Sequence, residues 1–120
     1  MKHRRTEATA IPPKVKQIVW ERDEHRCIFC KRYVPVEFAN AHYIKRSQGG
    51  LGIPENIFTA CPFCHDKEDF GGSTQLAYRN YAKVHLSSKY EDWDEKKLIY
   101  KKGMELWKDT ESIQTRNTQE

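Results

Sequence analysis

Two pairs of cysteines constrain the fold of this chain more than any other feature. They are Cys27 and Cys30 in the segment C-I-F-C, and Cys61 and Cys64 in the segment C-P-F-C. Two residues between the sulfurs let one tight turn present both thiolates to a single ion, and four thiolates complete the tetrahedral shell of a structural Zn²⁺. The spacing therefore predicts one zinc site that joins two segments far apart in the sequence.

Two disulfides are the alternative use of four cysteines. Residues 1–5 are basic and no apolar segment follows them, so the sequence shows no secretory signal. Disulfides are rare in proteins that are not exported, which favours zinc. The 120 residues are expected to form one domain with a small core. A zinc ion would supply folding free energy that such a core lacks.

Charge is distributed unevenly along the chain. Residues 1–50 contain 11 Lys or Arg and 5 Asp or Glu, whereas residues 51–120 contain 10 and 12. The basic first half suits a polyanion such as nucleic acid, although many soluble domains have a basic face without such a partner. No apolar run is long enough to span a membrane, so no membrane partner is expected.

Composition divides the chain into three parts. Residues 1–11 are polar and lack hydrophobic periodicity, which predicts a flexible basic arm, and residues 109–120 are polar and predicted to be disordered. The domain lies between them at residues 12–108, with its core at about 27–72 and a helical cover at about 73–108.

The core is predicted to contain both helices and strands, which places the chain in the α+β class. Helical spacing of apolar residues predicts a helix from Pro13 to Arg22. Short apolar runs predict two strands between Tyr33 and Ile44 and another at residues 57–59, joined by a glycine-rich loop at residues 45–56. A short helix then starts after the last cysteine and ends at Gly71.

A second helix and a last apolar element are predicted to cover the core. Ser73 is a candidate N-cap for a helix that reaches about Leu86, and its expected apolar face comprises Leu76, Ala77, Tyr81 and Val84. Asp94 is expected to cap or flank the last element, which contains Leu98, Ile99, Tyr100, Met104, Leu106 and Trp107.

Five features in order resemble the HNH endonucleases of the ββα-metal (His-Me finger) class, of the phage and prophage type. They are a C-x-x-C pair, His42 before the loop R-S-Q-G-G, Asn56, the second C-x-x-C pair, and His65 directly after it. The resemblance covers about residues 13–72 and, more loosely, the helical part that follows. It implies a zinc-stapled ββα-metal core with flanking N- and C-terminal helices. It also implies a DNA endonuclease or nickase that leaves a 5′-phosphate and a 3′-hydroxyl.

The resemblance assigns roles to the three namesake positions. His42 would be the general base that activates water, a task that a neutral imidazole suits near pH 7. Asn56 would either fasten the loop behind His42 or contribute to the metal site. His65 would bind the catalytic ion, and Asp69 lies on the same helical face four residues later. Imidazole and carboxylate without thiolates suit a divalent cation such as Mg²⁺, Mn²⁺ or Ni²⁺.

Other charged residues near these positions have two possible interpretations. Lys45 and Arg46 follow His42 closely and are candidates for binding the scissile phosphate, with Arg46 as the clamp. Asp66 and Glu68 are expected to be solvated or to cap backbone groups. The remaining histidines are assigned to the surface or the core; they are His3, His25 and His85.

The sequence departs from the family pattern at Ala41. Family members often have Asp or His there as a metal ligand. Either Asp69 replaces that ligand, or water and substrate phosphate complete the shell, or His42 itself contacts the ion.

Two other functions remain open on the sequence alone. One is a zinc-held DNA-binding module without activity, which Ala41 and the basic first half favour. The other is an accessory nuclease in phage DNA packaging or mobility, with packaging proteins as partners. In each case a monomer or weak dimer is expected, in the cytoplasm of a bacterial or phage-infected host cell. One active site cuts one strand, so a double-strand break would need two chains or two visits.

Overall fold

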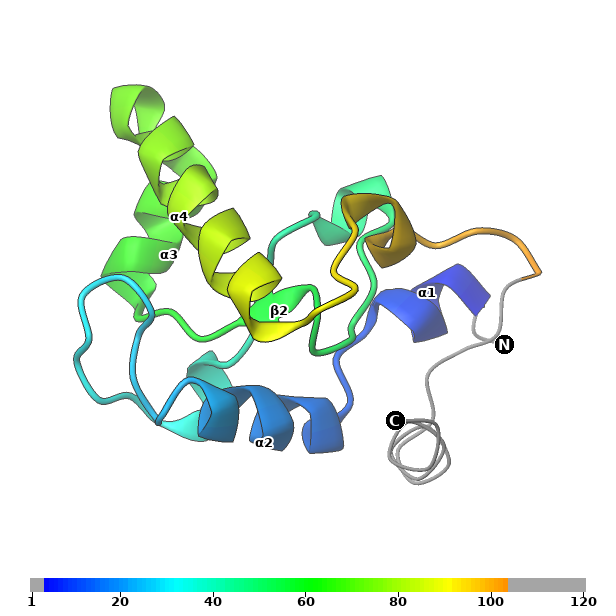
Figure 1. The fold of residues 1–120 in the computed structure, drawn as a ribbon, viewed down its shortest axis with the longest axis horizontal. Helices are drawn as coiled ribbons and strands as arrows, with labels where there is room; N and C mark the ends of the chain where they lie inside the picture. The colour runs from blue at the N-terminus through cyan, green and yellow to red at the C-terminus, as the bar shows by residue number, and fades with distance from the viewer. Residues whose placement is uncertain (1–3, 104–120) are drawn as a thin grey trace.

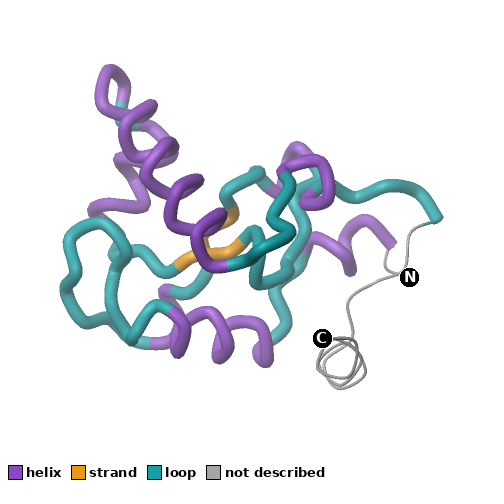
Figure 2. The backbone as a smooth tube through the Cα atoms, viewed as in Figure 1, coloured by secondary structure: helices purple, strands orange, loops and turns teal. Residues whose placement is uncertain are grey.

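The computed structural model describes residues 4–103 and has helices packed around a very short antiparallel sheet (Figure 1, Figure 2). Its α-helices and strands are α1 (Arg4–Thr9), α2 (Pro13–Arg22), β1 (Ala41–His42), β2 (Ile57–Phe58), α3 (Pro62–Phe70) and α4 (Gln75–Lys89). Its 3₁₀ turns are η1 (Val36–Phe38), η2 (Arg46–Gln48), η3 (Gly72–Thr74) and η4 (Glu95–Leu98). The presence of both helices and a two-stranded sheet confirms the α+β class.

The sheet is shorter than the sequence predicts. β1 and β2 pair antiparallel, with Ala41 opposite Phe58 and His42 opposite Ile57. Only one strand forms between residues 33 and 44 instead of two, because Pro35 lacks an N–H for a ladder and begins the turn η1. The strand predicted at residues 57–59 is confirmed as β2.

The core lies on both faces of β2. Phe58 packs in one buried cluster with Ala82 and Leu86 of α4, while Ile57 packs in another with Val15 and Val19 of α2. Figure 1 accordingly shows β2 between α4 and α2. The predicted helix from Pro13 to Arg22 is confirmed, and its apolar residues do hold it against the sheet.

The predicted apolar face of α4 is wrong. Leu76, Ala77, Tyr81 and Val84 are all exposed, Leu76 to 68% and Val84 to 66%. Buried instead are Ala82 and Leu86. Apolar residues occur on several sides of this helix, so hydropathy alone does not select a face. α4 also begins at Gln75 because Ser73 belongs to η3 and does not cap it.

The predicted flexible arm is a helix where the structure describes it. In α1, Thr9 is buried and Arg5 Nη2 donates a hydrogen bond to the Ser47 carbonyl at 3.0 Å. These polar contacts dock α1 on η2 without an apolar face, which explains why hydropathy does not reveal the helix. Predictions for residues 1–3, Met104, Leu106, Trp107 and the tail at residues 109–120 lie outside the described residues.

The end of the described chain closes over the loop before β2. As predicted, Asp94 caps an element, since its Oδ1 accepts a hydrogen bond from Lys96 N at 3.0 Å at the start of η4. Leu98 is buried and Ile99 forms an isolated antiparallel bridge with Gly50. Among the helices of residues 4–103, none combines the length and apolar character needed to traverse a bilayer.

Candidate metal centre and active site

The four cysteines come together as the sequence predicts. One ligand atom from each lies within 4.8 Å of all the others, and the Sγ atoms of Cys30 and Cys61 are 3.8 Å apart. Thiolates bound to one tetrahedral Zn²⁺ at about 2.3 Å lie about 3.8 Å from one another. All four are free cysteines, so the chain contains no disulfide among them. The cluster therefore fits a structural zinc ion.

Two local turns build this centre. The first follows Cys27 and ends at Lys31, whose φ of 70° is left-handed and whose N–H bonds to the Cys27 carbonyl at 3.0 Å. The second is the start of α3, where Cys61 is the N-cap and its Sγ accepts a hydrogen bond from Cys64 N at 3.4 Å. Burial raises the pKa of the Cys27 thiol, and a bound cation would keep this thiol ionised. The centre thereby fixes the start of α3.

His42 on β1 has one ring nitrogen occupied. Its Nε2 lies 2.8 Å from the Thr9 carbonyl of α1. A carbonyl only accepts hydrogen bonds, so Nε2 donates and Nδ1 keeps its lone pair. Burial lowers the pKa of His42, and the charges of Arg46, Lys45 and His65 lower it further against the opposing effect of the Thr9 bond. The ring is therefore neutral at pH 7 and has a nitrogen that can accept a proton.

Asn56 is fully buried and fastens the loop that follows His42. Its Oδ1 accepts a hydrogen bond from Ile44 N at 2.7 Å, and its Nδ2 donates to the carbonyls of Ile44 at 3.1 Å and Leu51 at 2.9 Å. Gly50 allows this closure, because a Cβ there would stand 1.7 Å from the Ile44 oxygen. Of the two roles expected for Asn56, these contacts match loop fastening.

His65 and Asp69 lie on one face of α3, as their spacing predicts. His65 Nε2 is 3.3 Å from Asp69 Oδ2, and both side chains are partly exposed. Glu68 joins them, since one ligand atom from each of the three residues lies within 4.8 Å of the other two. Imidazole and carboxylate ligands suit a hard or borderline divalent cation, so these three residues could hold one, and the expected second ion stays a prediction.

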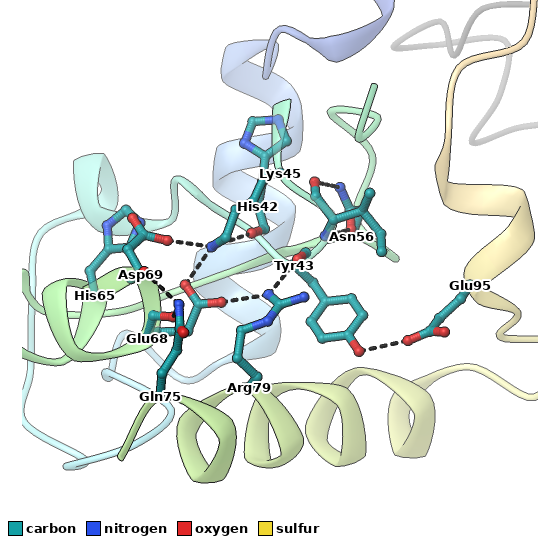
Figure 3. Close-up of polar contacts among 11 residues, drawn as sticks. His42, Tyr43, Lys45, Asn56, His65, Glu68, Asp69, Gln75, Arg79 and Glu95 are labelled. Carbon is teal, nitrogen blue, oxygen red and sulfur yellow. Dashed lines mark hydrogen bonds and ion pairs between the residues drawn. The ribbon is translucent and has the colours of Figure 1, made fainter. Parts of the chain in front are cut away.

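The environment of Glu68 differs from the one that the sequence predicts. The prediction of a solvated charge is wrong, because Glu68 is fully buried. Its Oε1 lies 2.6 Å from Lys45 Nζ and its Oε2 lies 2.6 Å from Arg79 Nη1, a contact network shown in Figure 3. Arg79 also donates to the Tyr43 carbonyl at 2.5 Å. The position of Cys64 in the sequence could have predicted the burial of Glu68. Cys64 must face the zinc centre, and Glu68 lies four residues later on the same helical face.

Lys45 and Arg46 both have internal partners. Lys45 Nζ contacts Glu68, Asp69 and, at 3.1 Å, the His42 carbonyl. Arg46 Nε donates to Thr9 Oγ1 at 3.0 Å and its Nη2 donates to the Thr6 carbonyl at 3.2 Å. Lys45 therefore connects the loop after β1 to α3, and Arg46 connects it to α1. The binding of phosphate by either residue stays a prediction.

Two other histidines have the structural roles expected of them. His25 stacks on Trp20 with ring centroids 3.6 Å apart, and His85 Nε2 lies 2.8 Å from Asp23 Oδ1. His3 lies outside the described residues.

Removing the Glu68 carboxylate is expected to destabilise the fold. Glu68→Ala would leave Lys45 and Arg79 without their shared partner, which costs about 3 kcal/mol for a buried ion-pair network. Urea unfolding of the zinc-loaded protein measures this loss. Asp66→Ala removes the same charge from an exposed position of α3 and should change stability by less than about 0.5 kcal/mol. Equal stabilities of the two variants would contradict the role of Glu68.

Comparisons with known proteins assign no function to this chain. The chain matches no family model, no curated protein and no solved structure.

Proposed function

We propose that this chain is a metal-dependent HNH DNA endonuclease or nickase whose β1, β2 and α3 form a ββα-metal unit. The observation that carries the proposal is the setting of His42: its Nε2 lies 2.8 Å from the Thr9 carbonyl, and its Nδ1 has no hydrogen bond among the described residues. Burial also lowers the pKa of His42, which favours the neutral ring. His65 is close enough for its charge to lower the pKa of His42. A proton acceptor beside a candidate ion site is what phosphodiester hydrolysis requires.

His42 is the general base in this proposal. Hydrolysis of a phosphodiester requires a group that takes a proton from the attacking water. Nδ1 performs this step, while the bond from Nε2 to Thr9 holds the ring orientation and stabilises the imidazolium that forms. Asn56 supports His42 indirectly, because it closes the loop at Ile44 and Leu51. Asn56 is accordingly a positioning residue.

His65 and Asp69 would hold the divalent cation, with Glu68 beside them. When bound, the cation supplies positive charge to the phosphate and the leaving oxygen. Ala41 offers no ligand, and its side chain is fully buried in the core cluster. The ligand set is therefore drawn from α3, which agrees with the expectation that Asp69 replaces the missing residue.

The four-cysteine centre has a structural role in the proposal. His65 directly follows Cys64, so an ion that clamps Cys61 and Cys64 to the first cysteine turn also sets the position of His65. Zinc held by four thiolates has no open coordination position, so it orients the site and takes no part in hydrolysis.

A supercoiled-plasmid assay tests the proposal. Zinc-loaded protein with added Mg²⁺, Mn²⁺ or Ni²⁺ is expected to convert supercoiled plasmid to the open circular form, because one site cuts one strand. The same protein without the added ion should leave the plasmid intact. Failure to nick DNA with every ion, by protein that is folded and zinc-loaded, would remove the nuclease assignment.

A DNA-binding module without activity is the second candidate. Two observations favour it: Ala41 supplies no ligand, and the ammonium of Lys45 lies among the carboxylates that would bind the cation. In the plasmid assay such a protein would retard DNA in a gel without nicking it. A role beside phage packaging proteins and a monomeric or weakly dimeric state remain predictions, which a pull-down and sedimentation would test.

A further inference from the structure

We propose that Lys45 is an internal competitor of the divalent cation, so that its ammonium and the ion occupy the α3 carboxylate site in turn. The inference rests on the proposed function for the identity of the ion site. It concerns the regulation of that site, because Lys45 sets the ion concentration at which the site fills.

The contacts of Lys45 resemble part of the ligand shell of a metal ion. Its Nζ is surrounded by three oxygens: Glu68 Oε1 at 2.6 Å, Asp69 Oδ1, and the His42 carbonyl at 3.1 Å. Carboxylate and carbonyl oxygens are the ligands that hard divalent cations take. Figure 3 shows the Lys45 amine between the carboxylates of Glu68 and Asp69.

The two cations cannot share these oxygens. Glu68 and Asp69 belong to the same group whose ligand atoms lie within 4.8 Å of one another. An ammonium and a divalent ion within a few ångströms repel each other, and in a partly buried site this repulsion is weakly screened. Entry of the ion therefore requires Lys45 to leave.

Lys45 can leave the site while Glu68 and Asp69 each keep another partner. The Lys45 side chain is 28% exposed, and its stem is flexible, so it can reach solvent. Glu68 keeps a partner when Lys45 departs, because Arg79 holds its other oxygen at 2.6 Å. Asp69 keeps His65 at 3.3 Å. The exchange thus replaces one cation by another and leaves no buried carboxylate unpaired.

The experiment compares the affinity for Mn²⁺ of three zinc-loaded proteins: the wild type, Lys45→Met and Lys14→Met. Binding is measured by electron paramagnetic resonance as the loss of the signal of free Mn²⁺. Lys14 is an exposed residue of α2, so its replacement removes the same charge far from the carboxylates in the chain. Lys45→Met is expected to bind Mn²⁺ at least about tenfold more tightly than the wild type. Lys14→Met should stay within about twofold of the wild type.

A double variant locates the gain. Lys45→Met with Asp69→Asn should lose the tighter binding, because the ion then lacks the carboxylate that Lys45 releases. Lys45→Gln, which keeps a donor but not the charge, gives the same test if the methionine variant does not fold. Three outcomes would each overturn the competition. The wild type and the Lys45 variants could have equal affinities for Mn²⁺, or none of them could bind Mn²⁺. The tighter binding of the Lys45→Met variant could also persist when Asp69 is replaced.

The outcomes separate this inference from the nuclease proposal. Tighter Mn²⁺ binding without plasmid nicking would support the competition and refute the nuclease. Nicking by a protein whose Lys45 variants bind Mn²⁺ no better would support the nuclease and refute the competition.

Discussion

Replacement of His42 by alanine is expected to reduce plasmid nicking by at least about 100-fold, because general-base catalysis contributes factors of this size. In the proposed mechanism His42 takes the proton from water, and the variant lacks that group. Burial lowers the pKa of His42, and the bond from Nε2 to the Thr9 carbonyl leaves the lone pair on Nδ1. The rate of open-circle formation at saturating ion measures the loss. Zinc content and the affinity for DNA should not change.

A matched variant separates the lost base from a disturbed fold. His42→Ala also removes the bond to the Thr9 carbonyl, which helps to dock α1. His42→Gln keeps an amide donor that can reach this carbonyl but lacks a basic nitrogen, so it should be as inactive as the alanine variant. His25→Ala, which removes a partly exposed histidine that stacks on Trp20, should retain full activity. Activity of His42→Gln near that of the wild type would remove His42 as the base.

Local spacing was sufficient to predict the parts of the site that depend on a single turn or helix. Two cysteines in C-x-x-C and the four-residue step from His65 to Asp69 fix geometry within one short element. The helix Pro13–Arg22 is similar, since its apolar period and prolines specify it locally. In these cases the structure agrees with the sequence because no distant residue decides the outcome.

Polar contacts between distant segments could not be predicted in the same way. Glu68 is buried because Lys45 from the loop and Arg79 from α4 meet it, 23 and 11 residues away. α1 packs through Arg5, Thr9 and Arg46 without an apolar face. Hydropathy classifies all of these residues as exposed, because the pattern of one segment does not reveal the charges that another segment brings to it.

Cys61→Ser is expected to unfold the domain at room temperature, the largest stability change in this protein. Structural Zn²⁺ sites in small domains bind with about 10–16 kcal/mol, which matches or exceeds the whole stability of a typical domain, about 5–15 kcal/mol. Cys61 contributes twice, because it belongs to the four-cysteine centre and also caps α3. Circular dichroism and zinc content measure the loss.

The metal-free wild type provides the control for this variant. Chelation of zinc should unfold the wild type as well, and added Zn²⁺ should refold the wild type but not Cys61→Ser. A small core explains the dependence: Phe58 packs on α4, whereas Ile57 packs on α2, so neither apolar cluster spans the whole domain. A zinc ion held by the four cysteines would tie the first cysteine turn to α3, and α3 contains His65, Glu68 and Asp69. A folded, zinc-loaded Cys61→Ser protein would show that the centre is not structural, and the position of His65 would then need another explanation.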